Sequence, residues 1–353
     1  MNILKDLIAS TENDMASIVE DGVFSGDILN FIDTGSYVFN ALLSGSIYGG
    51  IASNKITAFC GSPQTGKSFF VLGIVKNFLE TNPNSVVIYF ESEGALTKQI
   101  IVERGIDIKR MAIIPVDTVQ NFRTQILKVL EKYEQQDKKD RQKLLICLDS
   151  LGQLASEKEV FDATSGRDIT DMSRARIIKG LFRILTLKLA KVDVSLIITN
   201  HVYKEIGSMY PREIMSSGMG LAYAASTIVF LSRKKEKDGD EVVGNIIHCK
   251  NFKNRLAREN KMVDVLLTYD KGLNRYYGLS DLAIAAGIFK KPTTRIELPD
   301  GTKVFEKALN NNPEKYYTEE ILNKLNEVVK QMFLYGTSFI GEQDGKTEEE
   351  TND

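Results

Sequence analysis

The stretch FCGSPQTGKSFF, residues 59–70, decides the fold class of this 353-residue chain. It contains the pattern G-x-x-x-x-G-K-[ST], which is typical of a loop whose backbone N–H groups surround phosphate oxygens at the amino end of a helix. The apolar run KITAFC precedes the loop, and KSFFVLGIVKNFLE follows it with helical spacing. This context predicts a nucleotide-binding loop of eight residues: Gly61, Ser62, Pro63, Gln64, Thr65, Gly66, Lys67 and Ser68.

The loop and one later aspartate predict the cofactors ATP and Mg2+. Lys67 is expected to reach the outer phosphates, and the Ser68 hydroxyl is expected to bind the metal ion. Asp149 closes the apolar run LLICLD, where a carboxylate can complete the Mg2+ coordination beside Ser68. An aspartate after a buried strand often only caps the strand, but the preceding phosphate loop favours the metal role.

Two more strand ends carry polar residues that suit phosphate chemistry. The segment FESEGAL follows the run SVVIYFE, and a general base for an attacking water is expected there. The residues alone leave Glu91 and Glu93 both open for this role. His201 follows LIITN, at the strand end that faces ligand in open α/β sheets, where a polar side chain can sense the terminal phosphate. A purely structural role for His201 is equally compatible with its position.

Composition limits the class of protein. The net charge of −2 argues against a globally basic nucleic-acid-binding protein, so any such contact requires a local patch. Cys60, Cys147 and Cys249 lie in apolar runs without metal-ligand spacing, which predicts buried thiols in a reducing compartment. The sequence shows no signal peptide and no run of about 18 apolar residues, so we expect a cytoplasmic protein without membrane contact.

The order of apolar runs predicts a mostly parallel sheet followed by antiparallel strands. Strand-like runs alternate with helical patterns at residues 55–60, 85–91, 111–117, 143–151 and 194–200, which indicates parallel strands covered on both faces. The later runs STIVFLSR, GNIIHCKNF and MVDVLLTYD are separated by the turn-rich segments KKEKDGDE and LARENK, which favour antiparallel pairing. Four regions are expected: a lead-in arm (1–52), an ATPase core (53–280), a small helical domain (281–340) and a disordered acidic tail (341–353).

Two irregular segments leave the predicted nucleotide site. Residues 156–168 follow Asp149 and residues 202–220 follow His201, and long irregular loops of this kind are usually functional or mobile. The amphipathic pattern RARIIKGLFRILTLKLAK lies between them. It places Arg176, Lys179 and Arg183 in one basic stripe, for which a solvated helix face is the simpler interpretation.

In combination, these segments resemble the RecA-type recombinase family, most closely its phage branch, the UvsX-like recombinases. The resemblance is colinear from about 34 to 290, beginning with TGSYVFNALLSGSIYGG. It implies an α/β fold: a RecA-like P-loop ATPase core with a mostly parallel central sheet, late antiparallel strands and a small C-terminal helical appendage. It also implies a DNA-dependent ATPase that forms filaments on single-stranded DNA and catalyses homologous pairing and strand exchange in recombination, repair and replication.

The resemblance also implies roles for individual residues. The segment YFESEGALT assigns the catalytic glutamate to Glu93 and not to Glu91, and TNHVYKEIGSMY makes His201 the phosphate sensor, as in the phage branch. The same segment begins the second DNA-binding loop, so Met209 and Tyr210 are expected to wedge near bases.

Two groups of basic residues gain roles in the same way. RIIKGLF resembles the helix behind the first DNA loop, which gives Arg176, Lys179 and Arg183 a DNA-binding role in place of the solvated face. FKNRLARENK resembles the segment that carries two basic residues into the neighbouring subunit's ATP, here Lys253 and Arg255. One departure concerns the base: Thr97 and Ile100 stand where bacterial members place an Asp and a Tyr against adenine.

The implied partners are single- and double-stranded DNA, further copies of the chain in helical filaments, a loading protein and a single-strand binding protein. The implied location is the cytoplasm, of a host bacterium if the phage resemblance holds. A hexameric RecA-fold DNA helicase is the alternative function, but such proteins usually append a large N-terminal domain, and about fifty residues precede the core here. A nucleotide kinase would need an arginine-bearing lid, which the sequence does not indicate.

Overall fold

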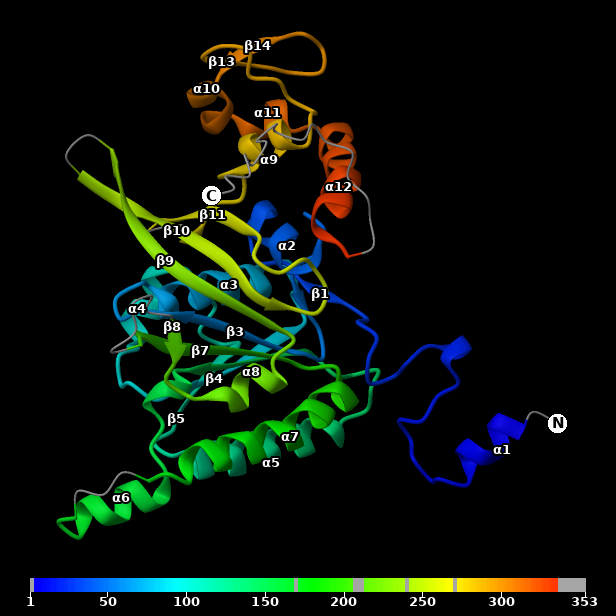
Figure 1. Ribbon diagram of the computed structural model, residues 1–353, viewed down its shortest axis with the longest axis vertical. Coiled ribbons are helices and arrows are strands. Elements are labelled where there is room, and N and C mark those ends of the chain that lie inside the picture. Colours follow the sequence, from blue (N-terminus) through cyan, green and yellow to red (C-terminus); the bar gives the residue numbers. More distant parts are fainter. Residues whose placement is uncertain (1–2, 168–170, 206–212, 239–240, 269–271, 336–353) are drawn as a thin grey trace, which may run out of the picture.

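A ten-stranded sheet forms the centre of the molecule, in a computed structural model that describes residues 3–167, 171–205, 213–238, 241–268 and 272–335 (Figure 1). The strand order is β12-β11-β10-β9-β3-β7-β6-β4-β5, with β8 paired to β7. The strands are β3 (Ile56–Gly61), β4 (Ser85–Glu91), β5 (Met111–Pro115), β6 (Lys143–Asp149), β7 (Ser195–Lys204), β8 (Glu213–Met215), β9 (Thr227–Asp238), β10 (Glu241–Asn254), β11 (Met262–Thr268) and β12 (Gly272–Leu273).

The predicted change from parallel to antiparallel pairing is confirmed. The strands β5, β4, β6, β7, β3 and β9 pair parallel in that order, whereas β9, β10, β11 and β12 pair antiparallel, as β8 does with β7. All six residues of β3 are buried, as are the last six of β6, because both faces of the parallel region are covered. Cys60, Cys147 and Cys249 are buried free thiols on these strands, as expected.

Helices cover the parallel strands on both faces, and each face has its own hydrophobic cluster (Figure 1). On one face lie α2 (Tyr37–Ser44) and α3 (Lys67–Thr81). The opposite face is covered by α5 (Val119–Glu134) and α7 (Arg174–Val192). The amphipathic pattern predicted for α7 is present, since Ile178, Leu181, Phe182, Leu185 and Leu189 are all buried.

The hairpin of β9 and β10 is longer than the sequence suggested. The segment KKEKDGDE was expected to form the turn, but β9 continues to Asp238 and β10 begins at Glu241. The ladder pairs Glu241 with Asp238, so strand pairing extends through the charged run. A ladder is held by backbone hydrogen bonds, which need no apolar side chains, and hydropathy therefore underestimates such a strand.

The expectation of an irregular loop over residues 156–168 is wrong, because α6 occupies Glu157–Thr164 and extends away from the body of the molecule (Figure 1). Ser156 and Glu159 form a capping box, in which each side chain accepts a hydrogen bond from the other residue's backbone N–H. The S-x-x-E pattern of a capping box is visible in the sequence and is the signal that predicts this helix.

The remaining elements precede the sheet, connect its strands or follow it. The N-terminal elements are α1 (Ile3–Ala9), η1 (Val19–Asp21), β1 (Phe31–Ile32) and β2 (Ile51–Ala52). Three short elements connect strands of the sheet: α4 (Lys98–Glu103), η2 (Leu151–Gln153) and α8 (Met219–Ala224). The C-terminal elements are α9 (Leu279–Ala285), β13 (Arg295–Glu297), β14 (Lys303–Phe305), α10 (Glu306–Asn311), α11 (Pro313–Tyr316) and α12 (Glu319–Phe333).

The four-region division stays a prediction. The C-terminal region is mainly helical as expected, with a small hairpin of β13 and β14 in addition. The predicted acidic tail lies outside the described residues. Among the residues that the structure describes, no helix is long and apolar enough to cross a membrane.

Candidate nucleotide-binding site

Strand register brings the predicted site residues to one edge of the sheet. Gly61 at the end of β3 lies opposite His201 on β7, and Glu91 at the end of β4 lies opposite Asp149 on β6. Because β6 pairs with β7, the four parallel strands end at the same edge. This edge of an open α/β sheet is the usual place for a bound ligand.

The phosphate loop connects β3 to α3, and its backbone requires a glycine at the helix start. Gly66 has a φ of 91° in the left-handed region, where a side chain would be strained. Lys67 begins α3, and its Nζ donates to the carbonyl oxygens of Gly61 (3.0 Å) and Ser62 (3.1 Å). Burial lowers the pKa of Lys67, and the charges of Asp149 and Glu93 oppose this effect.

These residues fit a nucleotide triphosphate with Mg2+. Within the described part of the chain, Lys67 forms no ion pair, and its buried ammonium group has two carbonyl oxygens and one histidine nitrogen as its hydrogen-bond contacts. A phosphate would supply the missing counter-charge. Among the described residues, no group of three or more His, Cys or carboxylate side chains could hold a metal ion.

Two hydroxyl groups from neighbouring strands hold the Asp149 side chain. Its Oδ2 accepts a hydrogen bond of 2.7 Å from the Tyr89 hydroxyl, and its Oδ1 accepts one from the Thr199 hydroxyl. Only 4% of Asp149 is exposed, so these two donors fix the carboxylate at the strand end. Tyr89 and Thr199 were not identified from the sequence. Their inward positions on neighbouring strands, each two residues before a strand-end site residue, were the available signal.

The two glutamates that the sequence left open have different environments. The Glu91 carboxylate accepts three backbone hydrogen bonds, from the N–H groups of Glu93 (3.1 Å), Gly94 (2.8 Å) and Ala95 (3.0 Å). It therefore shapes the turn after β4. Glu93 extends from that turn, where its Oε1 accepts a hydrogen bond of 2.9 Å from the Ser150 hydroxyl. This geometry favours Glu93 as the carboxylate that meets a substrate.

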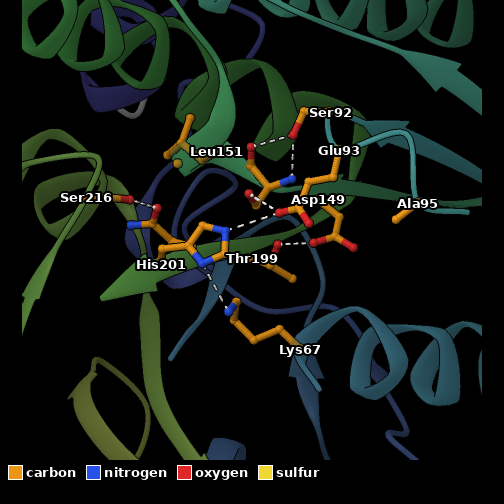
Figure 2. Close-up of polar contacts among 12 residues, drawn as sticks. Lys67, Ser92, Glu93, Ala95, Asp149, Leu151, Thr199, His201 and Ser216 are labelled. Carbon is orange, nitrogen blue, oxygen red and sulfur yellow. Dashed lines mark hydrogen bonds and ion pairs between the residues drawn. The ribbon is translucent and has the colours of Figure 1, made fainter. Parts of the chain in front are cut away.

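His201 lies between the lysine and the glutamate (Figure 2). Its Nδ1 is 3.4 Å from the Lys67 Nζ, and its Nε2 is 3.1 Å from the Glu93 Oε1. The side chains of His201 and Glu93 are 21% and 32% exposed, so both remain open to a ligand. The three residues come from the start of α3, the turn after β4 and the strand β7, and their polar atoms meet at this edge of the sheet.

The basic pair Lys253 and Arg255 lies far from this edge. Lys253 pairs with Ile228, which pairs with Ala58 near the start of β3, and the Arg255 backbone N–H donates to Ser226. The pair is therefore level with the beginning of β3, whereas the phosphate loop follows its end. Lys253 Nζ donates to the carbonyls of Ala222 (2.7 Å) and Ala225 (2.8 Å), at the end of α8.

The predicted DNA-binding residues are divided by the structure. Arg176, Lys179 and Arg183 are exposed on α7, as the stripe requires. Lys179 lies 5.7 Å from the ring centre of Tyr223 on α8, and Arg183 and Arg255 line the same groove between these helices. Met209 and Tyr210 lie outside the described residues.

The model of the RecA N-terminal domain matches residues 7–274. The chain belongs to the RecA family. Among its relatives, the recombination and repair protein of Enterobacteria phage T4 is 31% identical over 255 residues, which cover 72% of this chain and 63% of that protein. A RecA protein of Ruminococcus albus is 27% identical over 262 residues, 74% of this chain and 62% of the relative. The matches thus span less than two thirds of these two relatives.

A more distant relative matches over nearly the whole length. The RecA protein of Caulobacter vibrioides is 22% identical over an alignment of 360 positions, which covers 96% of this chain and 98% of that protein. The predicted α/β fold with its mostly parallel sheet is thus confirmed as the RecA-family fold.

One feature of this RecA-family site could not be predicted from the sequence. A hollow of about 390 Å³ lies beside the phosphate loop, where the Arg104 guanidinium covers the Phe69 ring at 3.9 Å. The buried Oδ1 of Asn245 in its wall has no hydrogen-bond partner among the described residues. Thr97, in contrast, uses its hydroxyl to cap α4 by accepting from the Ile100 N–H. A cation above an aromatic ring next to a phosphate loop cannot be recognised from sequence spacing.

Proposed function

We propose that the chain is a DNA-stimulated ATPase that forms filaments on single-stranded DNA and catalyses homologous pairing and strand exchange. Three findings support the proposal: membership of the RecA family, the similarity to a phage recombination and repair protein, and the meeting of Lys67, Glu93 and His201 at one sheet edge. The partners would be single- and double-stranded DNA, other copies of the chain, a loading protein and a single-strand binding protein.

The side chains have separable tasks in hydrolysis. The phosphate loop, with Lys67, would hold the outer phosphates of ATP, and Ser68 and Asp149 would hold Mg2+, which would neutralise charge on the transferring phosphoryl group. Glu93 accepts a proton from the attacking water at its carboxylate, which Ser150 orients by a hydrogen bond of 2.9 Å. His201 keeps Glu93 and Lys67 in register from the neighbouring strand.

One observation carries the link to DNA. His201 contacts both Lys67 and Glu93, and the chain continues from it through β7 towards the segment expected to contact DNA. A movement of His201 caused by a bound phosphate would therefore be transmitted along β7 to that segment. The groups are packed side by side, so coupling needs no distant relay.

We expect ATP turnover to be slow alone and to rise strongly with single-stranded DNA. Steady-state ATPase measured with and without an oligonucleotide tests this, and equal rates would contradict the coupling.

Electron microscopy with ATP and single-stranded DNA tests the assembly: open helical filaments support the recombinase, and closed rings support the helicase.

The basic stripe predicts a second outcome. Arg176→Ala and Arg183→Ala should weaken binding to every DNA sequence and lower the salt slope by about one for each phosphate that the variant no longer neutralises, because fewer counterions are released. Lys188→Ala is the control, since Lys188 is exposed on another face of α7. Binding titrations at several salt concentrations measure the slopes. Equal slopes in all four proteins would leave the stripe as a solvated helix face.

A further inference from the structure

Arg174 is the first residue of α7, and its side chain donates hydrogen bonds to backbone carbonyls of two separate segments. Its Nε donates to Leu154 (2.8 Å), and its Nη2 donates to Leu151 (3.2 Å) and Gly152 (3.1 Å). Its Nη1 reaches the carbonyl of Ser216 at 3.4 Å. Across the described ranges Arg174 has no carboxylate partner, so these carbonyls are its hydrogen-bonding environment.

Both segments are connected to the nucleotide site, one through the chain and one through hydrogen bonds. Leu151 starts η2 directly after Ser150, whose hydroxyl donates to Glu93. The Ser216 backbone N–H donates to the His201 carbonyl at 2.9 Å, and its hydroxyl donates to the Asn200 side chain at 2.9 Å. Arg174 therefore connects the ends of the strands that carry Asp149 and His201.

Two excursions of the chain, one after Asp149 and one after His201, are expected to contact DNA, and the same two segments close them. Asp171 accepts hydrogen bonds from the hydroxyls of Ser156 (2.6 Å) and Ser173 (2.8 Å), which closes the excursion containing α6 immediately before Arg174. Ser216 follows β8, where the second excursion returns to β7.

The two segments also touch directly. A Cβ added to Gly152 would lie 2.5 Å from the Ser216 Oγ and 3.1 Å from the His201 ring. Gly152 thus lies against Ser216 and His201 with no space for a side chain, so the two segments are closely packed at this point.

We propose that Arg174 is a positioning residue that couples the DNA-contacting excursions to the nucleotide site, while touching neither ligand itself. The planar guanidinium presents its donors in fixed directions, which lets one side chain bind carbonyls from both segments at once. A lysine has one nitrogen and cannot span the same set. The inference rests on the proposed DNA-stimulated ATPase.

The experiment measures binding in both directions. The affinity for a non-hydrolysable ATP analogue is determined with and without saturating single-stranded DNA, and the affinity for DNA with and without the analogue. The two ratios must agree, because coupling between sites is reciprocal, and typical factors are about 5 to 150. In Arg174→Gln the factor should fall below about twofold, with each separate affinity within about threefold of wild type. Arg174→Lys should give an intermediate factor.

Lys188→Gln is the matched control, since it removes a cation from an exposed position of the same helix and should keep the wild-type factor. A wild-type factor in Arg174→Gln would overturn the inference. So would a large loss of DNA affinity in the absence of nucleotide, which would indicate direct DNA contact. If Arg174→Gln does not fold, as judged by circular dichroism, Arg174→Lys decides: an intermediate factor supports the inference, and a wild-type factor overturns it. A wild-type protein with a factor of one would instead overturn the proposed function.

Discussion

Replacing Glu93 with glutamine should lower ATP hydrolysis about 10²- to 10⁴-fold while nucleotide affinity stays near the wild-type value. The substitution removes the proposed proton acceptor for the attacking water, and loss of a general base has effects of this size. The phosphate loop keeps its contacts, because the Lys67 ammonium donates to Gly61 and Ser62 and not to Glu93. Single-turnover hydrolysis and titration with a fluorescent ATP analogue separate the two quantities.

Glu91→Gln is the control that distinguishes a catalytic from a structural carboxylate. The Glu91 carboxylate accepts three backbone N–H groups, so an amide there should lower the free energy of unfolding by about 1 to 3 kcal/mol. Glu93→Gln should leave the unfolding free energy nearly unchanged, since Glu93 lies at the surface of the site. A Glu93→Gln protein that fails to bind nucleotide, or that hydrolyses at the wild-type rate, would show that the catalytic role is misassigned.

Loss of Lys253 and Arg255 should lower ATP hydrolysis about 10³- to 10⁵-fold, through the site of a neighbouring subunit. Basic residues supplied by a second subunit stabilise charge on the transferring phosphoryl group by this amount in related chemistry. Within one chain the pair cannot serve its own nucleotide, because it is level with the start of β3 and the phosphate loop follows the end of β3. The active site would then be formed at the subunit interface.

A mixture of two inactive proteins tests the assignment. Glu93→Gln keeps the basic pair, and Lys253→Ala/Arg255→Ala keeps the glutamate. In equal mixtures on DNA, roughly a quarter of random interfaces combine an intact Glu93 with an intact pair, so activity should recover to that order if the pair acts as an arginine finger does. A mixture as inactive as its components, with co-assembly verified, contradicts action between subunits.

The structure adds a second variant to this test. Lys253 donates to two carbonyls at the end of α8, so its removal also weakens that helix in its own chain. The Arg255 side chain makes a weaker contact with the described residues, from Nη2 to the Tyr223 carbonyl at 3.3 Å. Arg255→Ala therefore perturbs the fold less, and its complementation by Glu93→Gln is the clearer measurement.

The sequence alone determined the fold class and the position of the phosphate loop. Continuous apolar runs ending in Gly61 and Asp149 are specific to buried parallel strands, and the spacing of Gly66, Lys67 and Ser68 is a local property of the loop. The family resemblance added roles for Glu93, His201 and the basic residues, which stay predictions until the variants are measured. The prediction of an irregular loop over residues 156–168 was wrong, because the capping box S-x-x-E, which is also a local signal, begins a helix there.

Only the tertiary structure decided which polar groups meet. Sequence spacing left Glu91 and Glu93 equivalent, and the difference appeared when the turn after β4 placed three backbone N–H groups around Glu91 alone. The contact of His201 with Lys67 and Glu93 depends on β7 lying between β3 and β6, a strand order that no local pattern encodes. The bonds of Arg174 to Leu151 and Ser216 likewise join residues distant in sequence. Periodicity reports which side of a strand is buried, whereas hydrogen bonds between strand ends depend on the packing of the whole sheet.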